Sequence, residues 1–150
     1  MSSDIAVRPV RESELATILQ LWHEADVTPP SVTDSIEGLT RLIHEPGAVL
    51  LVAIIDARIV GSVIGGWDGC RGNIYRLAVT PECRRRGIAR RLVEEISGAL
   101  FDKGAQRLSA LVEHEHPWAT GFWDSLRDLG YQHDPKFARY IADRVIFRDT

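Results

Sequence analysis

The sequence predicts a single mixed α/β domain. Its 150 residues fit the usual size of one domain, and predicted strands and helices follow one another without a linker or repeat. Hydrophobic residues make up 45% of the chain and charged residues 26%, which is typical of a folded globular protein. We therefore expect one domain over residues 1–150, with a core large enough to fold without disulfide bonds or a structural metal.

The first part of the chain predicts one strand and two helices. Alternating apolar residues predict a strand over residues 5–10. Apolar residues then recur at helical spacing over residues 12–23. A second helix is predicted after the N-cap signal Thr33-Asp34-Ser35, and it ends at Pro46-Gly47.

The rest of the chain predicts a hairpin, further strands and two helices. The apolar runs over 48–55 and 59–67 are separated by a short turn, which predicts a hairpin. A strand over 73–79 follows, and then an amphipathic helix over 87–101. The remaining predicted elements are a strand over 107–112, a helix over 118–129 ended by Gly130, and a closing strand over 139–147.

Charge, hydropathy and cysteine content exclude several classes of protein. Eighteen basic and 21 acidic residues give a net charge of −3, which excludes a generally basic surface for nucleic acids. The longest apolar run, residues 48–55, is far shorter than the about 20 residues that cross a bilayer, and no signal peptide is readable. Cys70 and Cys83 form no disulfide or metal pattern, so the cytoplasm is the expected location.

The basic residues are concentrated at one point of the chain. Five arginines lie within positions 84–91, and only two basic residues of the whole chain are lysines. The cluster follows a predicted strand and opens a helix at the small residues Gly87 and Ala89. Unpaired N–H groups and the helix dipole make such a helix start a phosphate site, and glycine lets the phosphate approach the main chain. The residues therefore predict a turn that binds pyrophosphate, with arginines as charge-assisted donors.

This turn differs from two well-known phosphate-binding loops. The pattern GxxxxGK(S/T) is absent, so no lysine and hydroxyl are placed for Mg²⁺, and GxGxxG is absent as well. The alternative interpretation is a solvated arginine surface at the start of a helix. The strand-turn-helix context favours the phosphate site.

At this segment the chain resembles a known family. Arg84-x-x-Gly87-x-Ala89 after a Leu-Ala-Val strand is similar to the acyl-CoA motif Gln/Arg-x-x-Gly-x-Gly/Ala of the GNAT superfamily of N-acetyltransferases. Residues 122–131, Phe-Trp-x-x-Leu-x-x-Leu-Gly-Tyr, resemble the late helix signature of that family, and the element order matches over the whole chain. Among subgroups, Gly-Gly-Trp-Asp-Gly at 65–69 and Arg-Gly-Asn at 71–73 resemble the small bacterial YpeA-type acetyltransferases.

The resemblance implies a GNAT-like fold, in which helices flank a central, mostly antiparallel sheet, and a mode of cofactor binding. The fourth and fifth strands, here 73–79 and 107–112, would splay apart around the pantetheine arm of acetyl-CoA. The main chain of the turn would hold the pyrophosphate, and the Val79 N–H would face the thioester carbonyl. No metal is implied. The residues implied to bind acetyl-CoA are Leu77, Ala78, Val79, Arg84, Arg85, Arg86, Gly87, Ile88, Ala89 and Trp123.

Two side chains that often transfer protons in the family have no match here. The position of the glutamate on the central strand is Asn73, and the position of the late-helix tyrosine is Trp123, whose indole N–H is not a usable acid. An amine must be neutral when it attacks, and reference pKa values are near 8 for an α-amino group and near 10.4 for lysine. We therefore expect direct attack in a ternary complex, with proximity supplying much of the barrier reduction and water or another group taking the proton.

Several residues are candidates for catalysis and for acceptor binding. The Val79 N–H is expected to stabilise the developing oxyanion, while Glu113, His116 and Tyr75 are candidates for proton transfer. A solvated loop over 113–116 and a core position for Tyr75 are the alternatives, and a metal site in that loop is not favoured because no third ligand is fixed. The residues expected to contact the acceptor are Trp22, Trp67 and Asp68, with core packing or a turn as the alternatives.

The sequence thus predicts an acetyl-CoA-dependent N-acetyltransferase that acts on a primary amine of a small molecule, a peptide N-terminus or a lysine. The alternative is a CoA-binding sensor or interaction module that has lost catalysis, because a fold alone does not establish an activity. The net negative charge argues against nucleic acid as a partner. The expected partners are acetyl-CoA and an amine that is not a polyanion, with no membrane, and a homodimer through the C-terminal strand, as in many relatives, is left open.

Overall fold

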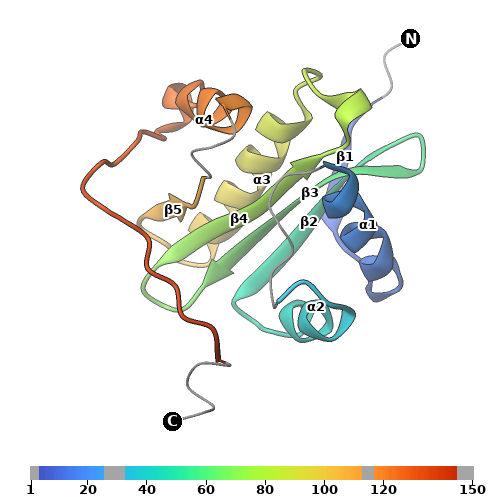
Figure 1. The fold of residues 1–150 in the computed structure, drawn as a ribbon, viewed down its shortest axis with the longest axis horizontal. Helices are drawn as coiled ribbons and strands as arrows, with labels where there is room; N and C mark the ends of the chain where they lie inside the picture. The colour runs from blue at the N-terminus through green and yellow to red at the C-terminus, as the bar shows by residue number, and fades with distance from the viewer. Residues whose placement is uncertain (1–3, 26–32, 113–116, 145–150) are drawn as a thin grey trace.

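The computed structural model describes residues 4–25, 33–112 and 117–144. Five strands form one sheet in the order β1-β2-β3-β4-β5, in which the first four are antiparallel and β4 and β5 are parallel (Figure 1). The strands are β1 (Ala6–Pro9), β2 (Ala48–Ile55), β3 (Arg58–Trp67), β4 (Gly72–Val79) and β5 (Leu108–Ala110). The helices are α1 (Leu15–Ala25), α2 (Ile36–Ile43), α3 (Ile88–Asp102) and α4 (Pro117–Asp124). The predicted mixed α/β fold with a mostly antiparallel central sheet is confirmed.

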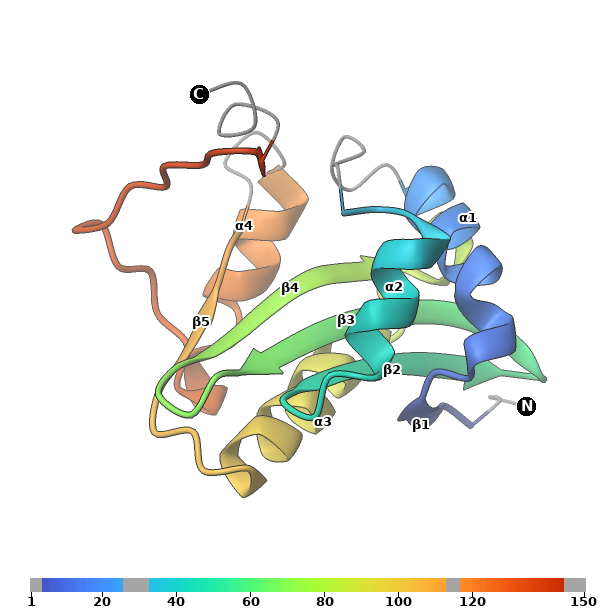
Figure 2. The ribbon, with the colours of Figure 1, turned by 90° about the horizontal axis from the view of Figure 1, so that it is seen from below.

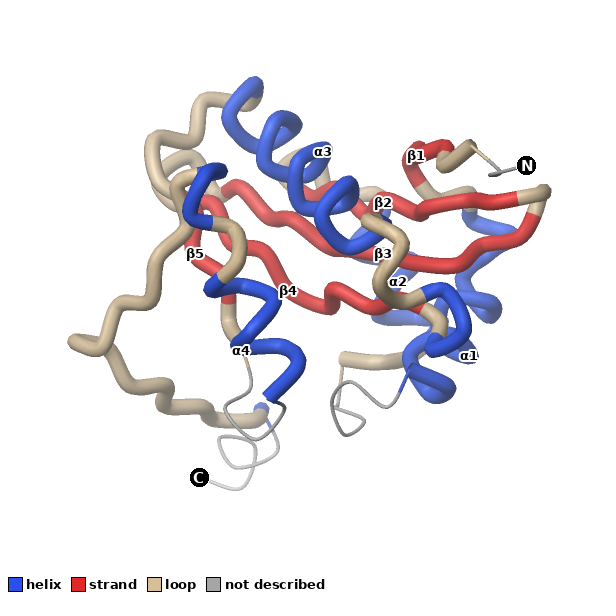
Figure 3. Tube along the Cα trace, turned by 90° about the horizontal axis from the view of Figure 1, so that it is seen from above, coloured by secondary structure: helices blue, strands red, loops and turns tan. Residues whose placement is uncertain are grey.

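Helices cover both faces of the sheet. Figures 2 and 3 show α1 and α2 on one face and α3 on the other. Each face has its own hydrophobic cluster, and α3 approaches β3 closely because two glycines face it. A Cβ atom at Gly65 would lie 2.8 Å from Ile96, and one at Gly61 would lie 3.0 Å from Leu92. Side chains at these two positions would push α3 away from the sheet.

The starts of α2 and α3 follow the sequence signals, whereas α2 ends at Ile43, before the predicted end at Pro46-Gly47. Ser35 caps α2, because its side chain accepts a hydrogen bond of 2.9 Å from the Gly38 N–H, as the N-cap pattern predicts. The helix α3 begins one residue after Gly87, which is its N-cap and has a left-handed backbone (φ 79°). Helix α1 extends two residues beyond the predicted end at His23.

The late elements are shorter than predicted. The strand predicted over 107–112 is only the three residues of β5. The helix predicted over 118–129 ends at Asp124 and is followed by a separate 3-10 turn, Arg127–Leu129. The Ser125 hydroxyl donates a hydrogen bond to the Phe122 carbonyl, and this local bond competes with continued helix.

The prediction of a closing strand over 139–147 is wrong for residues 139–144, the part that the structure describes. These residues form no ladder, and Tyr140 and Ile141 are exposed. A strand needs a neighbour with unpaired backbone groups, and β5 offers an edge of only three residues. Residues 145–147 lie outside the described residues.

Candidate functional site

The fourth and fifth strands separate halfway along β4. Their pairing comprises three positions and ends where Ile74 faces Ala110. Beyond that point β4 continues to Val79 with β3 as its neighbour, while β5 turns away (Figure 2). We call residues 72–74 the paired half of β4 and residues 75–79 the splayed half. The predicted splay is therefore confirmed.

The splayed half turns backbone donors toward its open edge. The Thr80 N–H donates a hydrogen bond of 2.8 Å to the Val60 carbonyl on β3. Backbone groups alternate along a strand, so the preceding Val79 N–H points away from β3. A hydrogen-bond donor therefore faces the gap between the strands at the end of β4.

A β-bulge separates the two halves of β4. Ser62 pairs with Ala78 and Ile64 with Tyr75, so that Arg76 and Leu77 together face a single residue of β3. Arg76 has a left-handed backbone with φ 55°. Backbone N–H groups along β4 point alternately toward and away from β3, and the bulge shifts this alternation by one residue before Val79.

The turn after β4 presents main-chain groups at the start of α3. A short 3-10 helix, Pro81–Cys83, leads into residues 84–87, in which Arg85 and Gly87 have φ values of 65° and 79°. Backbone in such conformations gathers N–H groups into a concave, anion-binding surface. A Cβ atom added at Gly87 would meet no atom within 4 Å, so the space above this residue is open. The start of α3 adds the positive end of its dipole.

The first arginine of the cluster is engaged by its neighbours. Arg84 donates a hydrogen bond of 2.8 Å to the Ala25 carbonyl at the end of α1. Its guanidinium also lies 5.0 Å from the ring centre of Trp118 in α4. Arg84 thus caps one helix and stacks on another, on either side of the turn.

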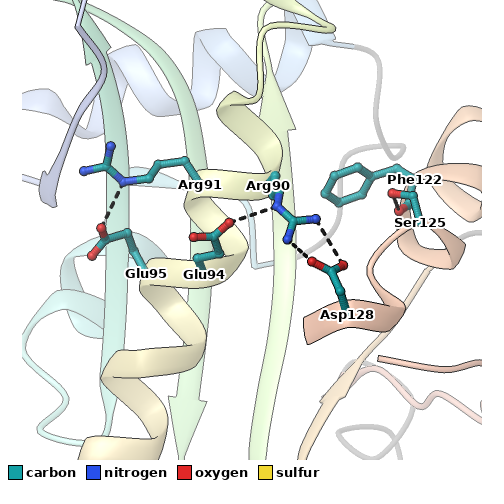
Figure 4. A network of polar contacts seen from close by, with 7 residues as sticks. All are labelled: Arg90, Arg91, Glu94, Glu95, Phe122, Ser125 and Asp128. Atoms are coloured by element: carbon teal, nitrogen blue, oxygen red, sulfur yellow. Dashed lines mark hydrogen bonds and ion pairs between the residues drawn. The ribbon is translucent and has the colours of Figure 1, made fainter. Parts of the chain in front are cut away.

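Arg90 and Arg91 are paired with carboxylates (Figure 4). Arg90 forms a 3.0 Å ion pair with Glu94 and a two-pronged contact with Asp128, which lies after α4. Hydrogen bonds from Arg90 hold the pKa of Asp128 below its usual range. Arg91 forms a 3.0 Å ion pair with Glu95. These two arginines therefore brace α3.

Arg85 and Arg86 complete the cluster. Both are exposed beside Gly87, and neither has a carboxylate partner among the described residues. Arg86 makes a weak 3.9 Å contact with the sulfur of Cys83. Their charges are available to an anion at the turn. Arg84, Arg85 and Arg86 are the arginines predicted to contact phosphate. Because Arg84 is engaged by Ala25 and Trp118, the side chains of Arg85 and Arg86 are the ones accessible to a phosphate.

The splayed strand and the glycine turn match a known family. The model of the acetyltransferase (GNAT) family matches residues 14–131. The chain belongs to the GNAT acetyltransferase family. It is similar to acetyltransferase ECA0875 of Pectobacterium atrosepticum and to acetyltransferase YE1169 of Yersinia enterocolitica. Each is 32% identical over 120 residues, which cover 80% of this chain and 84% of the relative. The GNAT chain is accordingly an N-acetyltransferase.

Solved structures share the GNAT fold at low sequence identity. One is the aminoglycoside 6'-N-acetyltransferase AAC(6')-IG from Acinetobacter haemolyticus, with a TM-score of 0.74 and 18% identity over 92% of this chain and 98% of that one. Another is AAC(6')-Iy in complex with the bisubstrate analogue CoA-S-monomethyl-acetylneamine, with a TM-score of 0.74 and 17% identity over 94% of this chain and 99% of that one. At this identity the likeness shows the fold.

The structure places one predicted proton-transfer candidate of this acetyltransferase on the splayed half. Tyr75 lies on the sheet face covered by α1 and α2, and 38% of its surface is exposed. Partial burial raises the pKa of its hydroxyl, which therefore keeps its proton at neutral pH. Asn73 is exposed on the paired half. Glu113 and His116 lie outside the described residues, so their roles stay predictions.

The three predicted acceptor contacts are not brought together. Trp22 is buried in the cluster under α1, and its indole N–H donates a 2.8 Å hydrogen bond to the Ser62 hydroxyl. Trp67 packs into the cluster on the α3 face. The Asp68 carboxylate accepts hydrogen bonds from the N–H groups of two residues in the turn before β4, which lower its pKa. Acceptor contact by these residues stays a prediction.

Trp123 lies in a small aromatic group on α4 and beyond it. Its ring meets that of Tyr131 edge-on at 5.1 Å, and the Tyr131 hydroxyl is 2.6 Å from the Ser97 hydroxyl of α3. Trp123 also packs against the α3-face cluster. The bond from Tyr131 to Ser97 is not predicted by the sequence, although Tyr131 ends the Leu-Gly-Tyr signature.

The described residues contain neither a metal-binding cluster nor a membrane-spanning helix. No group of three or more His, Cys, Asp or Glu side chains that could hold a metal ion is present there. Within the same residues, no helix is both long and apolar enough to cross a membrane.

Proposed function

We propose that this acetyltransferase takes its acetyl group from acetyl-CoA and transfers it to a primary amine by direct attack in a ternary complex. The acceptor is a small molecule, a peptide N-terminus or a lysine. One observation carries the proposal: the splayed half of β4, whose outer edge has no strand partner among the described residues, leads through the 3-10 helix Pro81–Cys83 into the glycine turn before α3. A linear acyl carrier with a diphosphate at its far end fits such an arrangement.

The turn fits the diphosphate of coenzyme A. Gly87 has a left-handed backbone, and an added Cβ would occupy the open space that a phosphate needs. Arg85 and Arg86 supply positive charge there, and Ile88 and Ala89 begin the helix whose N–H groups face the same side. The main chain of residues 77–79 would pair with the pantetheine arm as a further strand would.

The Val79 N–H is assigned the electrostatic role. When bound, acetyl-CoA supplies a thioester carbonyl that an amine can attack. Negative charge develops on the carbonyl oxygen during attack, and a fixed backbone donor in a site without water stabilises that charge. The Val79 N–H points to the splayed edge and needs no rearrangement to act.

Tyr75 is assigned to proton handling at the acceptor side. Tyr75 begins the splayed half, two residues before Leu77, where pairing with the pantetheine arm is expected to start. Its hydroxyl keeps its proton at neutral pH. It can donate that proton in a hydrogen bond toward the leaving sulfur or the amine. Deprotonation of the amine is left to water or to Glu113 and His116, as the sequence predicts.

Solved structures that share the fold support an amine acceptor. The aminoglycoside acetyltransferases that share the fold act on amines, and one is bound to a CoA–aminoglycoside analogue. We therefore include aminoglycosides in the set of acceptors to be tested. The absence of a matching tyrosine at Trp123 and glutamate at Asn73 keeps the alternative of a CoA-binding sensor as an outcome of the test.

The test is acetyl-CoA turnover with a panel of amines. The purified protein is mixed with acetyl-CoA and, one at a time, polyamines, aminoglycosides, amino acids, N-terminal peptides and lysine peptides. Release of the CoA thiol is followed by a colorimetric thiol reagent, and the acetylated product is identified by mass spectrometry. CoA binding without turnover on any amine supports the sensor, and no binding of CoA contradicts the proposal.

A further inference from the structure

Arg76 has an unusual backbone for a residue inside a strand. Four non-glycine residues have positive φ among those described: Asp56 and Ala57 in the β2–β3 turn, Arg85 in the turn before α3, and Arg76. The first three belong to turns, whereas Arg76 lies within β4. Left-handed backbone at a long side chain persists only where the surroundings hold it.

The side chain of Arg76 is held from two helices. Its guanidinium forms an ion pair with the Asp34 carboxylate just before α2, and the two side chains are only 12% and 13% exposed. The same guanidinium lies 5.1 Å from the ring centre of Trp22 on α1. Trp22 is in turn bonded to Ser62 of β3 at 2.8 Å. We call these four residues the Arg76 network.

The bulge decides where the Val79 N–H points. Tyr75 pairs with Ile64 on β3, and an unbulged strand continued from this pair would place Val79 opposite Val60. The bulge places Val79 opposite Gly61 instead. Because backbone direction alternates, this shift of one residue turns the Val79 N–H from the β3 ladder to the splayed edge.

We infer that Arg76 is a positioning residue: anchored by Asp34 and Trp22, it holds the β4 bulge that aims the Val79 N–H at the acyl group. The inference rests on the proposed function, because it assumes that a thioester lies along the splayed edge. It adds a role for the α1 and α2 side of the molecule. Residues remote from the thioester set the direction of the donor that polarises it.

The test reads the thioester carbonyl itself and needs no acceptor. Acetyl-CoA carrying ¹³C at the carbonyl is bound to the protein, and the carbonyl stretch is measured by infrared difference spectroscopy. In the wild type we expect a shift to lower wavenumber relative to free acetyl-CoA, because a hydrogen bond weakens the C=O bond. Affinity for CoA, which lacks the carbonyl, is measured in parallel by calorimetry.

Two variants of Arg76 separate the anchor from the backbone. Arg76→Ala removes the anchoring side chain and leaves an alanine, which disfavours positive φ. We expect most of the carbonyl shift to be lost, while the Kd for CoA changes less than threefold. Arg76→Gly removes the same side chain but accepts positive φ, so it retains more of the shift than Arg76→Ala. Equal loss in both variants would show that the side-chain anchor alone holds the bulge, whereas a full shift in both would overturn the inference.

Asp34→Ala and Arg8→Ala complete the set. Asp34→Ala removes the anchor from outside the strand, and we expect it to lose the carbonyl shift as well. Arg8→Ala breaks a comparable ion pair, with Glu14 at 2.7 Å and side chains 28% and 19% exposed, on β1 far along the chain from the bulge. It should keep the full shift, and its thermal midpoint gives the cost of losing such a pair.

The remaining outcomes are decisive. A wild-type shift retained in both Arg76→Ala and Asp34→Ala overturns the inference, as does a loss in Arg8→Ala equal to theirs. A wild type that binds acetyl-CoA without any carbonyl shift also overturns it, while leaving CoA binding intact. A wild type that binds neither CoA nor acetyl-CoA overturns the proposed function, and the inference falls with it.

Discussion

The two halves of β4 have the same neighbour on one side and different surroundings on the other. The paired half lies between β3 and β5, and Gly72 and Ile74 are buried there. The splayed half keeps β3 but loses β5, so its outer backbone groups have no strand partner in the described sheet. Eight residues of one strand thus contain a structural segment and a segment with unused hydrogen-bonding groups.

Under the proposed function, this difference lets the sheet bind a linear ligand along one strand edge. Unpaired backbone donors at a sheet edge are normally a hazard, because they can pair with another chain. Here the edge ends in a turn with open space above Gly87 and exposed arginines, so a ligand with one phosphate end is the suitable partner. The paired half supplies rigidity, and the bulge sets the boundary between the two functions.

The largest expected effect tests the end of the splayed half. Gly87→Trp should abolish binding of acetyl-CoA, because the side chain fills the open space at the turn and forces a bulky residue into a left-handed backbone. Calorimetric titration with CoA measures it. Gly69→Trp is the matched control, since Gly69 also has positive φ and open space but lies in the turn before the paired half. Unchanged CoA affinity in Gly87→Trp would argue against the assigned turn.

A second change removes one donor from the splayed edge. Val79→Pro deletes the N–H that points away from β3 and leaves the Thr80 bond to Val60 in place. Loss of one oxyanion donor typically lowers turnover about 100- to 1,000-fold. Val79→Ala is the control, because it loses the same packing against α3 and keeps the N–H. Steady-state turnover with an acceptor from the amine panel should separate the two, and equal rates would remove Val79 from the mechanism.

The parts of β4 and its surroundings that depend on neighbouring residues in the chain are predicted by the sequence. The strand, the turn and the start of α3 follow from apolar periodicity, from Pro81 and from Gly87, which act on their immediate neighbours. The acyl-CoA motif lies within the same short segment. The splay of the two strands comes from the family resemblance, since nothing in either strand by itself says where their pairing stops.

The bulge and the Arg76 network are beyond sequence reasoning. A bulge is a property of register, so it exists only relative to the pairing of β3 with β4. The ion pair of Arg76 with Asp34 joins residues 42 positions apart. The closing strand fails for a related reason, because alternation in residues 139–144 does not tell whether a sheet edge is open to receive it.

A third prediction concerns the paired half and stability. Gly72→Val places a branched side chain where an added Cβ already lies 2.5 Å from Leu108 on β5. Overpacking of this kind costs about 1–3 kcal/mol of unfolding free energy. Denaturant unfolding measures the loss, and the Kd for CoA should change less than threefold. A large loss of CoA affinity at unchanged stability would contradict the division of β4 into two halves.

The smallest expected effect concerns Trp123 of α4. Trp123→Tyr should lower turnover by less than tenfold, because the indole supplies no acid and its ring packs edge-on against Tyr131. Tyr131→Phe is the companion variant, since it keeps the ring contact and deletes the 2.6 Å bond to Ser97. Initial rates at saturating acetyl-CoA measure both. A tenfold or greater loss in Trp123→Tyr alone would place Trp123 at the acyl group. The acyl site would then be formed by α4 together with the splayed half of β4.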